Sequence, residues 1–298
     1  MKAYLEILRP GNCLMSIIAV LIGSFLILKT FDFTTLLASI SVFLITGAGN
    51  AINDYIDIEA DKVNRPKRPI PSGRIKPKAA LFYSIVLFLI GIILSLFTTW
   101  PAFSLAIINS VLLIAYAFYL KNTAFVGNFV VSYLVGSTFL FGSLASLTAF
   151  SMHAITIPLL LMLLATLTNF SREVVKTLED LEGDKKAFIK NLIRKAKEKL
   201  LAKFRIKKET VEFRYSEKLT KSVAALSLFI VILLSPLPYL LGFLGLAYLG
   251  IVVLADLIFL YSATVLFSKN KKRYSNSSKL IKLGMFVGLI SYIVGVVF

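Results

Sequence analysis

The stretch LLASISVFLITGAGNAINDYIDIEAD, residues 36–61, joins an apolar segment long enough to cross a bilayer to a run of carboxylates at helical spacing. Asn53, Asp57 and Asp61 follow one another at four-residue steps, so all three can share one face of a helix over about 12 Å. Oxygen ligands in such a row suit a hard divalent cation. The stretch therefore predicts a membrane helix that ends in a cation site.

Apolar segments of similar length recur along the rest of the chain, which is 57% hydrophobic and only 16% charged. That composition is far too apolar for a soluble domain of 298 residues. The predicted fold is an all-α polytopic membrane bundle of nine transmembrane helices around a central cavity, in one domain, residues 1–298, with loops at 59–78 and 179–218. The nine predicted spans are 13–29, 36–58, 79–98, 101–121, 124–148, 152–178, 218–241, 243–267 and 279–298.

The placement of the basic residues predicts the orientation in the membrane. The net charge is +17, and of the 33 Lys and Arg only Lys29 lies at an odd-numbered loop under this assignment. This is the positive-inside pattern of a multi-pass cell-membrane protein with its N-terminus in the cytoplasm and its C-terminus outside. The charge is therefore explained by anionic lipid headgroups rather than by nucleic acid, and no obligate protein partner is implied.

The single cysteine and the single histidine limit the metal chemistry. Cys13 alone excludes an internal disulfide and a cysteine metal cage, and His153 lies in a short loop on the outer side, far from the acidic residues. Any metal is therefore expected to be held by oxygen.

A second acidic cluster, REVVKTLEDLEGDK at residues 172–185, ends the sixth predicted span. Asp180 and Asp184 are again four residues apart, and Glu173 and Thr177 can share their face. Acids at helix ends often only anchor the interface, but Asp contributes little to topology, and unpaired carboxylates this close would repel each other. We predict that the two clusters face each other across one cytoplasmic cavity and hold one or two Mg²⁺ ions.

Basic side chains surround both clusters and are the donors that a phosphate or diphosphate needs. Each of them alone is as well explained by headgroup binding. Tyr116 lies five residues before Lys121, where its ring can stabilise a carbocation, although a membrane tyrosine is more often an interface anchor. Asp256, in the middle of the eighth span, is either functional or a pairing residue inside the bundle.

Residues 187–217 form a basic insertion in the second loop. Apolar residues recur there at three- and four-residue steps with lysines and arginines between them. The pattern indicates either a basic amphipathic helix on the membrane surface or a solvated positive loop, and the sequence leaves both open.

The motifs resemble those of the UbiA superfamily of intramembrane prenyltransferases. The family's first motif is matched by NDYIDIEAD at 53–61 with NRPKRP at 64–69, and its second by Asp180 and Asp184. Tyr116 with Leu120-Lys121, and RPGN at 9–12, match two shorter family patterns. Two departures stand out: Thr177 occupies a position where relatives usually carry Asp, and residues 188–191 replace a Gly-x-Lys-Thr-like run.

Within the family, residues 172–184 are most similar to archaeal digeranylgeranylglyceryl phosphate synthases. The resemblance implies Mg²⁺-dependent transfer of a geranylgeranyl group from its diphosphate to the glycerol C2 hydroxyl of geranylgeranylglyceryl phosphate, through an allylic cation. An enzyme that prenylates an aromatic quinone precursor such as 4-hydroxybenzoate is the nearest alternative. A cation-coupled transporter is the non-enzyme alternative, although transporters place ionisable groups near the bilayer midplane.

The predicted site has three groups of residues. The predicted metal ligands are Asn53, Asp57, Asp61, Asp180 and Asp184; the catalytic residues are Asp57, Asp61, Asp180, Asp184 and Tyr116; and the diphosphate- and phosphate-binding residues are Arg9, Asn12, Arg65, Arg68, Lys121, Arg172, Lys176 and Lys190.

Overall fold

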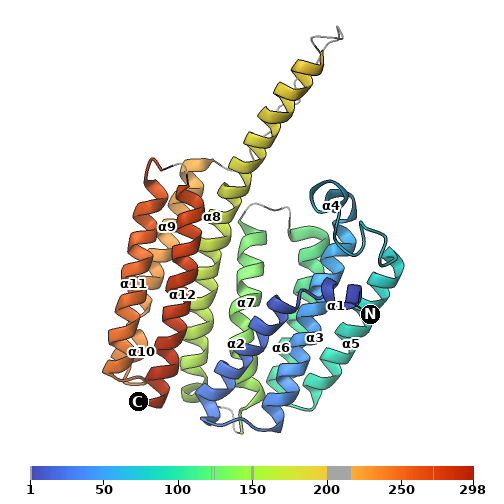
Figure 1. Ribbon diagram of the computed structural model, residues 1–298. Helices are drawn as coiled ribbons and strands as arrows, with labels where there is room; N and C mark the ends of the chain where they lie inside the picture. The colour runs from blue at the N-terminus through green and yellow to red at the C-terminus, as the bar shows by residue number, and fades with distance from the viewer. Residues whose placement is uncertain (1, 122, 124, 149–150, 200–215, 271) are drawn as a thin grey trace.

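The computed structural model is all-helical over the residues that it describes (Figure 1). These are residues 2–199 and 216–298 except 122, 124, 149, 150 and 271; the side chains of residues 60, 63, 64, 153 and 180–199 are also outside the description. The elements are α1 Lys2–Ile7, α2 Pro10–Leu28, α3 Phe33–Ile56, α4 Ile58–Asn64, α5 Pro77–Leu96, α6 Trp100–Ala115, the π-helix η1 Tyr116–Leu120, α7 Val126–Ala145, α8 Met152–Lys199, α9 Glu217–Leu234, α10 Leu237–Leu240, α11 Leu246–Phe267 and α12 Arg273–Val297.

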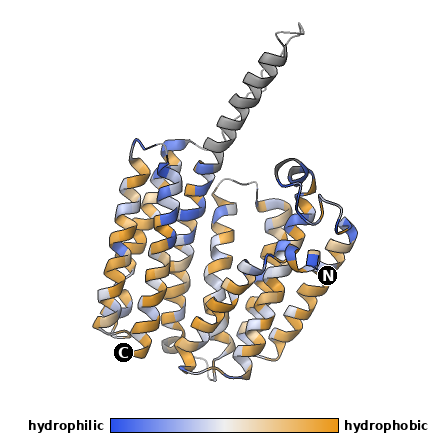
Figure 2. Ribbon diagram, viewed as in Figure 1, coloured by the Kyte–Doolittle hydropathy of each residue, from blue (hydrophilic) through white to orange (hydrophobic). Residues whose placement is uncertain are grey.

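Nine helical segments in the described part are long and apolar enough to cross a membrane, and each overlaps one predicted span. For example, the prediction 218–241 corresponds to the segment Glu217–Leu240. The predicted fold class is thus confirmed. Figure 2 shows that hydrophilic residues gather at one end of the bundle, the end that carries α4.

Local sequence signals set several helix starts. Pro10, Pro77 and Pro101 lie in the first turns of α2, α5 and α6, where a missing N–H costs nothing. The Asp32 carboxylate caps α3 by accepting a hydrogen bond from the Thr35 N–H at 2.9 Å. The predicted spans therefore began within a few residues of the observed helices.

The helices pack around two apolar clusters. One is built mainly from α3, α5 and α6 and the other mainly from α8, α9, α11 and α12, while α2 and α7 contribute to both. Figure 1 shows these groups on the two sides of the molecule, with α7 between them. The bundle is thus two helical groups that share α2 and α7.

A seam of small residues joins α2 to α7. A Cβ atom on Gly23 would lie 2.0 Å from the Phe139 carbonyl oxygen, and one on Gly142 would lie 2.2 Å from the Val20 carbonyl oxygen. The Ser143 hydroxyl donates to the Gly23 carbonyl at 2.7 Å, and the Ser24 hydroxyl donates to the Gly142 carbonyl at 3.1 Å. Only glycine permits backbones to approach this closely in a membrane bundle.

Candidate active site

A cavity of about 1500 Å³ lies between the two helical groups. Its apolar lining comes from several spans and includes Val42, Ile45, Leu113, Leu134, Phe139, Phe141, Leu161 and Leu164. Exposed apolar side chains of α2 and α12, among them Met15, Ile18, Leu283 and Phe286, also line it. The cavity therefore offers an apolar surface that is continuous with the outer surface of the bundle.

The first acidic motif lies where α3 meets α4. The sequence predicted one continuous helical face, but α3 ends at Ile56 and α4 begins at Ile58, with Asp57 between them at φ −83° and ψ 9°. The i to i−4 hydrogen bonds nevertheless continue, since the Asp57 N–H donates to the Asn53 carbonyl at 3.0 Å and the Asp61 N–H to the Asp57 carbonyl at 2.8 Å. Because the break is this slight, all three residues still line the cavity.

Each carboxylate of this motif touches a basic side chain. Asp57 forms an ion pair with Lys121, 64 residues further along the chain. Asp61 accepts a hydrogen bond from Arg68 at 2.5 Å. The predicted acidic and basic residues therefore meet in one place, and all four line the cavity.

Asp54 belongs to the same ion-pair network but lies away from the cavity surface. Its side chain is 3% exposed and lies against Arg9 at 2.5 Å and Arg68 at 3.0 Å. Unlike Asp57 and Asp61, it is not among the residues that line the cavity. A buried carboxylate needs such partners to remain charged, so Asp54 serves to hold two arginines in position.

One hydrogen bond fixes the chain beside Arg9. Arg9 itself has a positive φ of 52° at the start of α2, and the Asn50 amide donates to the Leu8 carbonyl at 2.8 Å. This anchor ties the corner between α1 and α2 to α3. The predicted binding residues Arg9, Asn12 and Arg65 line the same cavity.

An exposed ion pair ties the loop after α4 to α1. The Arg74 guanidinium contacts both carboxylate oxygens of Glu6, at 2.5 and 2.9 Å, and donates to the Lys67 carbonyl at 2.6 Å. The hydrogen bond from Arg74 lowers the pKa of Glu6 below its usual value. This contact braces the loop that carries Arg68.

Tyr116 and Lys121 flank a π-helical turn that the sequence did not indicate. η1 follows α6 directly, and the Lys121 N–H donates to the Tyr116 carbonyl at 3.0 Å, five residues back. Such a turn shifts the positions of side chains around the helix axis and is common at functional sites. Here both Tyr116 and Lys121 line the cavity.

The opposite wall of the cavity carries the residues before the second acidic motif. Arg172, Glu173, Lys176 and Glu179 of α8 line it. Arg172 donates to Glu173 at 2.8 Å, and Lys176 lies 3.7 Å from the other Glu173 oxygen. The first motif and the residues that precede Asp180 and Asp184 therefore line one cavity from two sides.

The remaining second-motif residues are only partly described. Asp180, Asp184 and Lys190 lie on α8, but their side chains are outside the described part, as is the stretch 200–215 of the predicted basic insertion. Thr177 is described and accepts a hydrogen bond from Asn128 of α7 at 3.2 Å. Unlike its neighbours Lys176 and Glu179, it is not among the residues lining the cavity.

Comparison with known proteins identifies the family. A family model described as the UbiA prenyltransferase family matches residues 16–290. The chain belongs to this family. The resemblance in the motifs is thus confirmed, and the chain is a multi-pass membrane prenyltransferase rather than a transporter.

The family members most relevant to the site are similar over their whole length. A digeranylgeranylglyceryl phosphate synthase from Methanococcoides burtonii is 42% identical over 307 residues, covering 99% of this chain and 100% of the relative. A solved structure of digeranylgeranylglyceryl phosphate synthase superposes with a TM-score of 0.81 at 34% identity, covering 99% and 98% of the two chains. A UbiA homologue from Archaeoglobus fulgidus, solved with GPP and Mg²⁺, shares the fold with a TM-score of 0.66 at 14% identity, covering 98% and 100%.

The residues present here fit the metal that was found in that homologue. Asn53 Oδ1 is buried in the cavity wall and finds no hydrogen-bond partner in the described part of the chain. Asp57 and Asp61 each keep acceptor capacity beyond one cation contact. Because no three carboxylate, histidine or cysteine side chains converge among those described, further ligands would have to come from elsewhere, such as Asp180 and Asp184.

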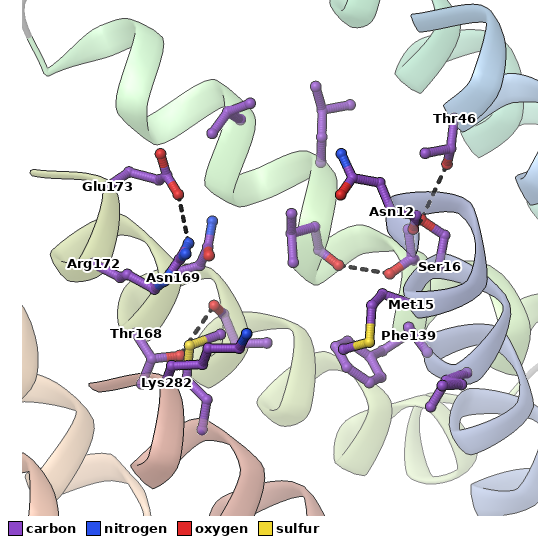
Figure 3. A pocket seen from close by; sticks show the side chains of 18 of the residues that line it. Asn12, Met15, Ser16, Thr46, Phe139, Thr168, Asn169, Arg172, Glu173 and Lys282 are labelled. Carbon is purple, nitrogen blue, oxygen red and sulfur yellow. Dashed lines mark hydrogen bonds and ion pairs between the residues drawn. The ribbon is translucent and has the colours of Figure 1, made fainter. Parts of the chain in front are cut away.

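Sequence reasoning missed polar residues of α12 and α8. Lys279 and Lys282 of α12 and Thr168 and Asn169 of α8 line the cavity. Figure 3 shows Thr168, Asn169, Arg172, Glu173 and Lys282 on one side of it and Asn12, Met15, Ser16 and Thr46 on the other. The available signal was a pair of lysines three residues apart inside an apolar span.

Asp256 also lines the cavity and has a partner within the bundle. It accepts a hydrogen bond from the Ser235 hydroxyl at 2.6 Å, and the Tyr248 hydroxyl donates to the Ser235 carbonyl at 2.5 Å. Its other oxygen is buried and unpartnered in the described part. Both alternatives raised for Asp256 therefore remain compatible with its surroundings.

Proposed function

We propose that the protein transfers a geranylgeranyl group from geranylgeranyl diphosphate to the glycerol C2 hydroxyl of geranylgeranylglyceryl phosphate, a step in archaeal ether-lipid synthesis. The observation that carries the proposal is a cavity with acidic and basic side chains and an apolar lining, in a chain 42% identical over its length to a synthase of this name. The positive-inside pattern supports a cytoplasmic position for this active site.

In this proposal Asn53, Asp57 and Asp61, with Asp180 and Asp184, hold Mg²⁺ on the donor diphosphate. The metal supplies Lewis-acid stabilisation of the leaving charge. Arg9, Arg65, Arg68 and Lys121 lie at the same wall and donate to the outer phosphate oxygens. Three of these donors, Arg9, Arg68 and Lys121, are already held by Asp54, Asp57 and Asp61, so little reorganisation is needed when the diphosphate arrives.

The transfer breaks the bond between C1 of the prenyl chain and the diphosphate oxygen, which leaves with the electron pair. The Tyr116 ring lies at the cavity wall, where it stabilises the allylic cation. The acceptor hydroxyl oxygen forms the new bond to C1, and its proton passes to a carboxylate or to the released diphosphate. The apolar lining holds both prenyl chains and keeps water away from the cation.

The test is a transfer assay with purified protein, Mg²⁺ and labelled geranylgeranyl diphosphate, offered either geranylgeranylglyceryl phosphate or 4-hydroxybenzoate. We expect a Mg²⁺-dependent product with the glyceryl phosphate only, and loss of that product when a chelator is added. Product with 4-hydroxybenzoate alone, or product that forms equally well without divalent metal, would refute the proposal.

A further inference from the structure

Lys282 occupies an unusual place for a lysine. It lies nine residues after the first residue of α12, about 13 Å along the helix, inside a segment assigned as a membrane span. Its side chain is exposed and lines the cavity (Figure 3). A charged side chain within a membrane span is rare and often marks a substrate path.

The neighbours of Lys282 do not neutralise it. Neither Lys279 nor Lys282 has an ion-pair partner among the described side chains. Arg172 lies on the same side of the cavity (Figure 3), and its carboxylate neighbour Glu173 is shared with Lys176. Among the described side chains, four cations of α8 and α12, two of them without an ion-pair partner, thus line the cavity with three carboxylates: Glu173, Glu179 and, from α11, Asp256.

An excess of cations on one wall of a cavity is costly unless an anion binds there. A diphosphate that carries Mg²⁺ is largely neutralised by its metal, and those proposed metal ligands whose side chains are described, Asn53, Asp57 and Asp61, belong to the other wall. A phosphate monoester binds without metal and takes its whole compensation from the protein. The α8–α12 wall therefore suits a phosphate monoester better than a metal-bound diphosphate.

We propose that Lys282, with Arg172 and Lys279, binds the phosphate group of the acceptor; this inference rests on the proposed function. C2 is the middle carbon of glycerol, so the phosphate is attached to the carbon beside the one that bears the reacting hydroxyl. A cation that fixes the phosphate therefore also positions the hydroxyl, and the diphosphate binds at the opposite wall with the reacting atoms between them. Lys282 is thereby a specificity-determining residue for phosphorylated acceptors.

The test compares two acceptors that differ only in the phosphate: geranylgeranylglyceryl phosphate and geranylgeranylglycerol. For Lys282→Gln we expect kcat/KM with the phosphorylated acceptor to fall by about tenfold or more, mainly through KM, because one charged hydrogen bond is lost. With the unphosphorylated acceptor, and in the KM for geranylgeranyl diphosphate, we expect changes below about twofold. Lys282→Arg should restore most of the activity, and Lys272→Gln, an exposed lysine just before α12, is the matched control.

Equal losses with the two acceptors, or a KM increase confined to the diphosphate, would overturn the inference. A binding measurement separates it from the proposed function: the phosphorylated acceptor should raise the melting temperature of the detergent-solubilised wild type and of Lys272→Gln, but not of Lys282→Gln. If the wild type transfers nothing yet shows this Lys282-dependent rise, the proposed function fails and the phosphate site stands. If the wild type transfers and the variant shows the same rise, the phosphate site fails.

Discussion

The two walls of the cavity hold their charges in different ways. On the α3–α4 wall, Asp54, Asp57 and Asp61 each contact an arginine or lysine. On the α8–α12 wall, Glu173 is shared by two cations, while Lys279 and Lys282 have no described carboxylate partner. The charges of the α3–α4 wall, here called the paired wall, are matched before substrate arrives. The α8–α12 wall has lysines whose charge only a bound anion would match. The difference suggests a division of labour between a metal-assisted leaving group and a directly bound phosphate.

The strongest test of the paired wall removes a carboxylate that it presents to the cavity. Asp57→Ala is expected to lower the transfer rate at least about 100-fold, because it removes both a proposed metal ligand and the partner of Lys121. Asp184→Ala is expected to have a similar effect if the second motif completes the ligand set. The measurement is kcat with saturating substrates and Mg²⁺, on protein shown to be folded by circular dichroism.

Glu59→Gln is the matched control for Asp57→Ala. Glu59 belongs to the same motif, but its side chain is 85% exposed and pairs only with Lys62 at the surface. We expect its transfer rate to stay near that of the wild type. Near-normal activity in Asp57→Ala, or an equal loss in Glu59→Gln, would remove the basis for a metal site on this wall.

A stability experiment compares the two walls directly. Arg68→Ala removes one of two partners from the buried Asp54 and the partner of Asp61, so we expect a loss of about 3–5 kcal/mol in the free energy of unfolding. Arg172→Ala should cost less than about 1 kcal/mol, because the pair is part-exposed and Glu173 keeps Lys176. Denaturant unfolding in detergent measures both, and similar losses would contradict the contrast between the walls.

Asn53 offers a milder change on the paired wall. Because its Oδ1 is buried beside Asp57 without a hydrogen-bond partner in the described part of the chain, Asn53→Ala should raise the Mg²⁺ concentration for half-maximal activity by on the order of tenfold. Asn50→Ala is the control one turn earlier: its amide donates to Leu8, so we expect a loss of about 1 kcal/mol in stability and an unchanged Mg²⁺ requirement. A titration of activity against Mg²⁺ distinguishes the two, and matching curves would contradict a metal-ligating role for Asn53.

The smallest effect is expected at an exposed pair outside both walls. The lowered pKa of Glu6 means that its pairing with Arg74 stabilises the fold above the ordinary glutamate pKa and is lost as the pH falls through the lowered value. Glu6→Gln should therefore change the melting temperature little at pH 7 and make no difference in strong acid. A large change in melting temperature at pH 7 would show that the Glu6–Arg74 ion pair stabilises the fold more than expected for an exposed pair.

The fold was predictable because a bilayer fixes the length of each apolar segment. The prediction 101–121 corresponds to the span Trp100–Leu120, and the charge alternation independently supported the number of spans. The family was predictable from NDYIDIEAD and NRPKRP, and the proposed activity from the resemblance of residues 172–184; they agree with the family match and with a synthase 42% identical over its length. The roles of the individual site residues stay predictions.

The rest depends on packing that no local pattern encodes. The pairing of Asp57 with Lys121 joins residues 64 apart, and the π-helical turn before Lys121 has no known residue signature here. Lys282 was visible as a lysine in an apolar span, but whether it faces the cavity or the lipid is decided by how α12 packs against α8 and α11. The same is true of Asn53, whose free oxygen is apparent only once its neighbours are in place.

The close contact between α2 and α7 fixes how far the α3–α4 wall is shifted along the bundle axis relative to the α8–α12 wall. With Gly23 and Gly142 seated against facing carbonyl groups, the two helices have one longitudinal alignment, because a slide of even part of a turn would drive backbone into backbone. α3 packs on α2 and α8 packs on α7, so this alignment is passed to both walls. The relative height of the two walls along the bundle, and so the level at which leaving group and nucleophile meet, is therefore set by two uncharged residues, Gly23 and Gly142.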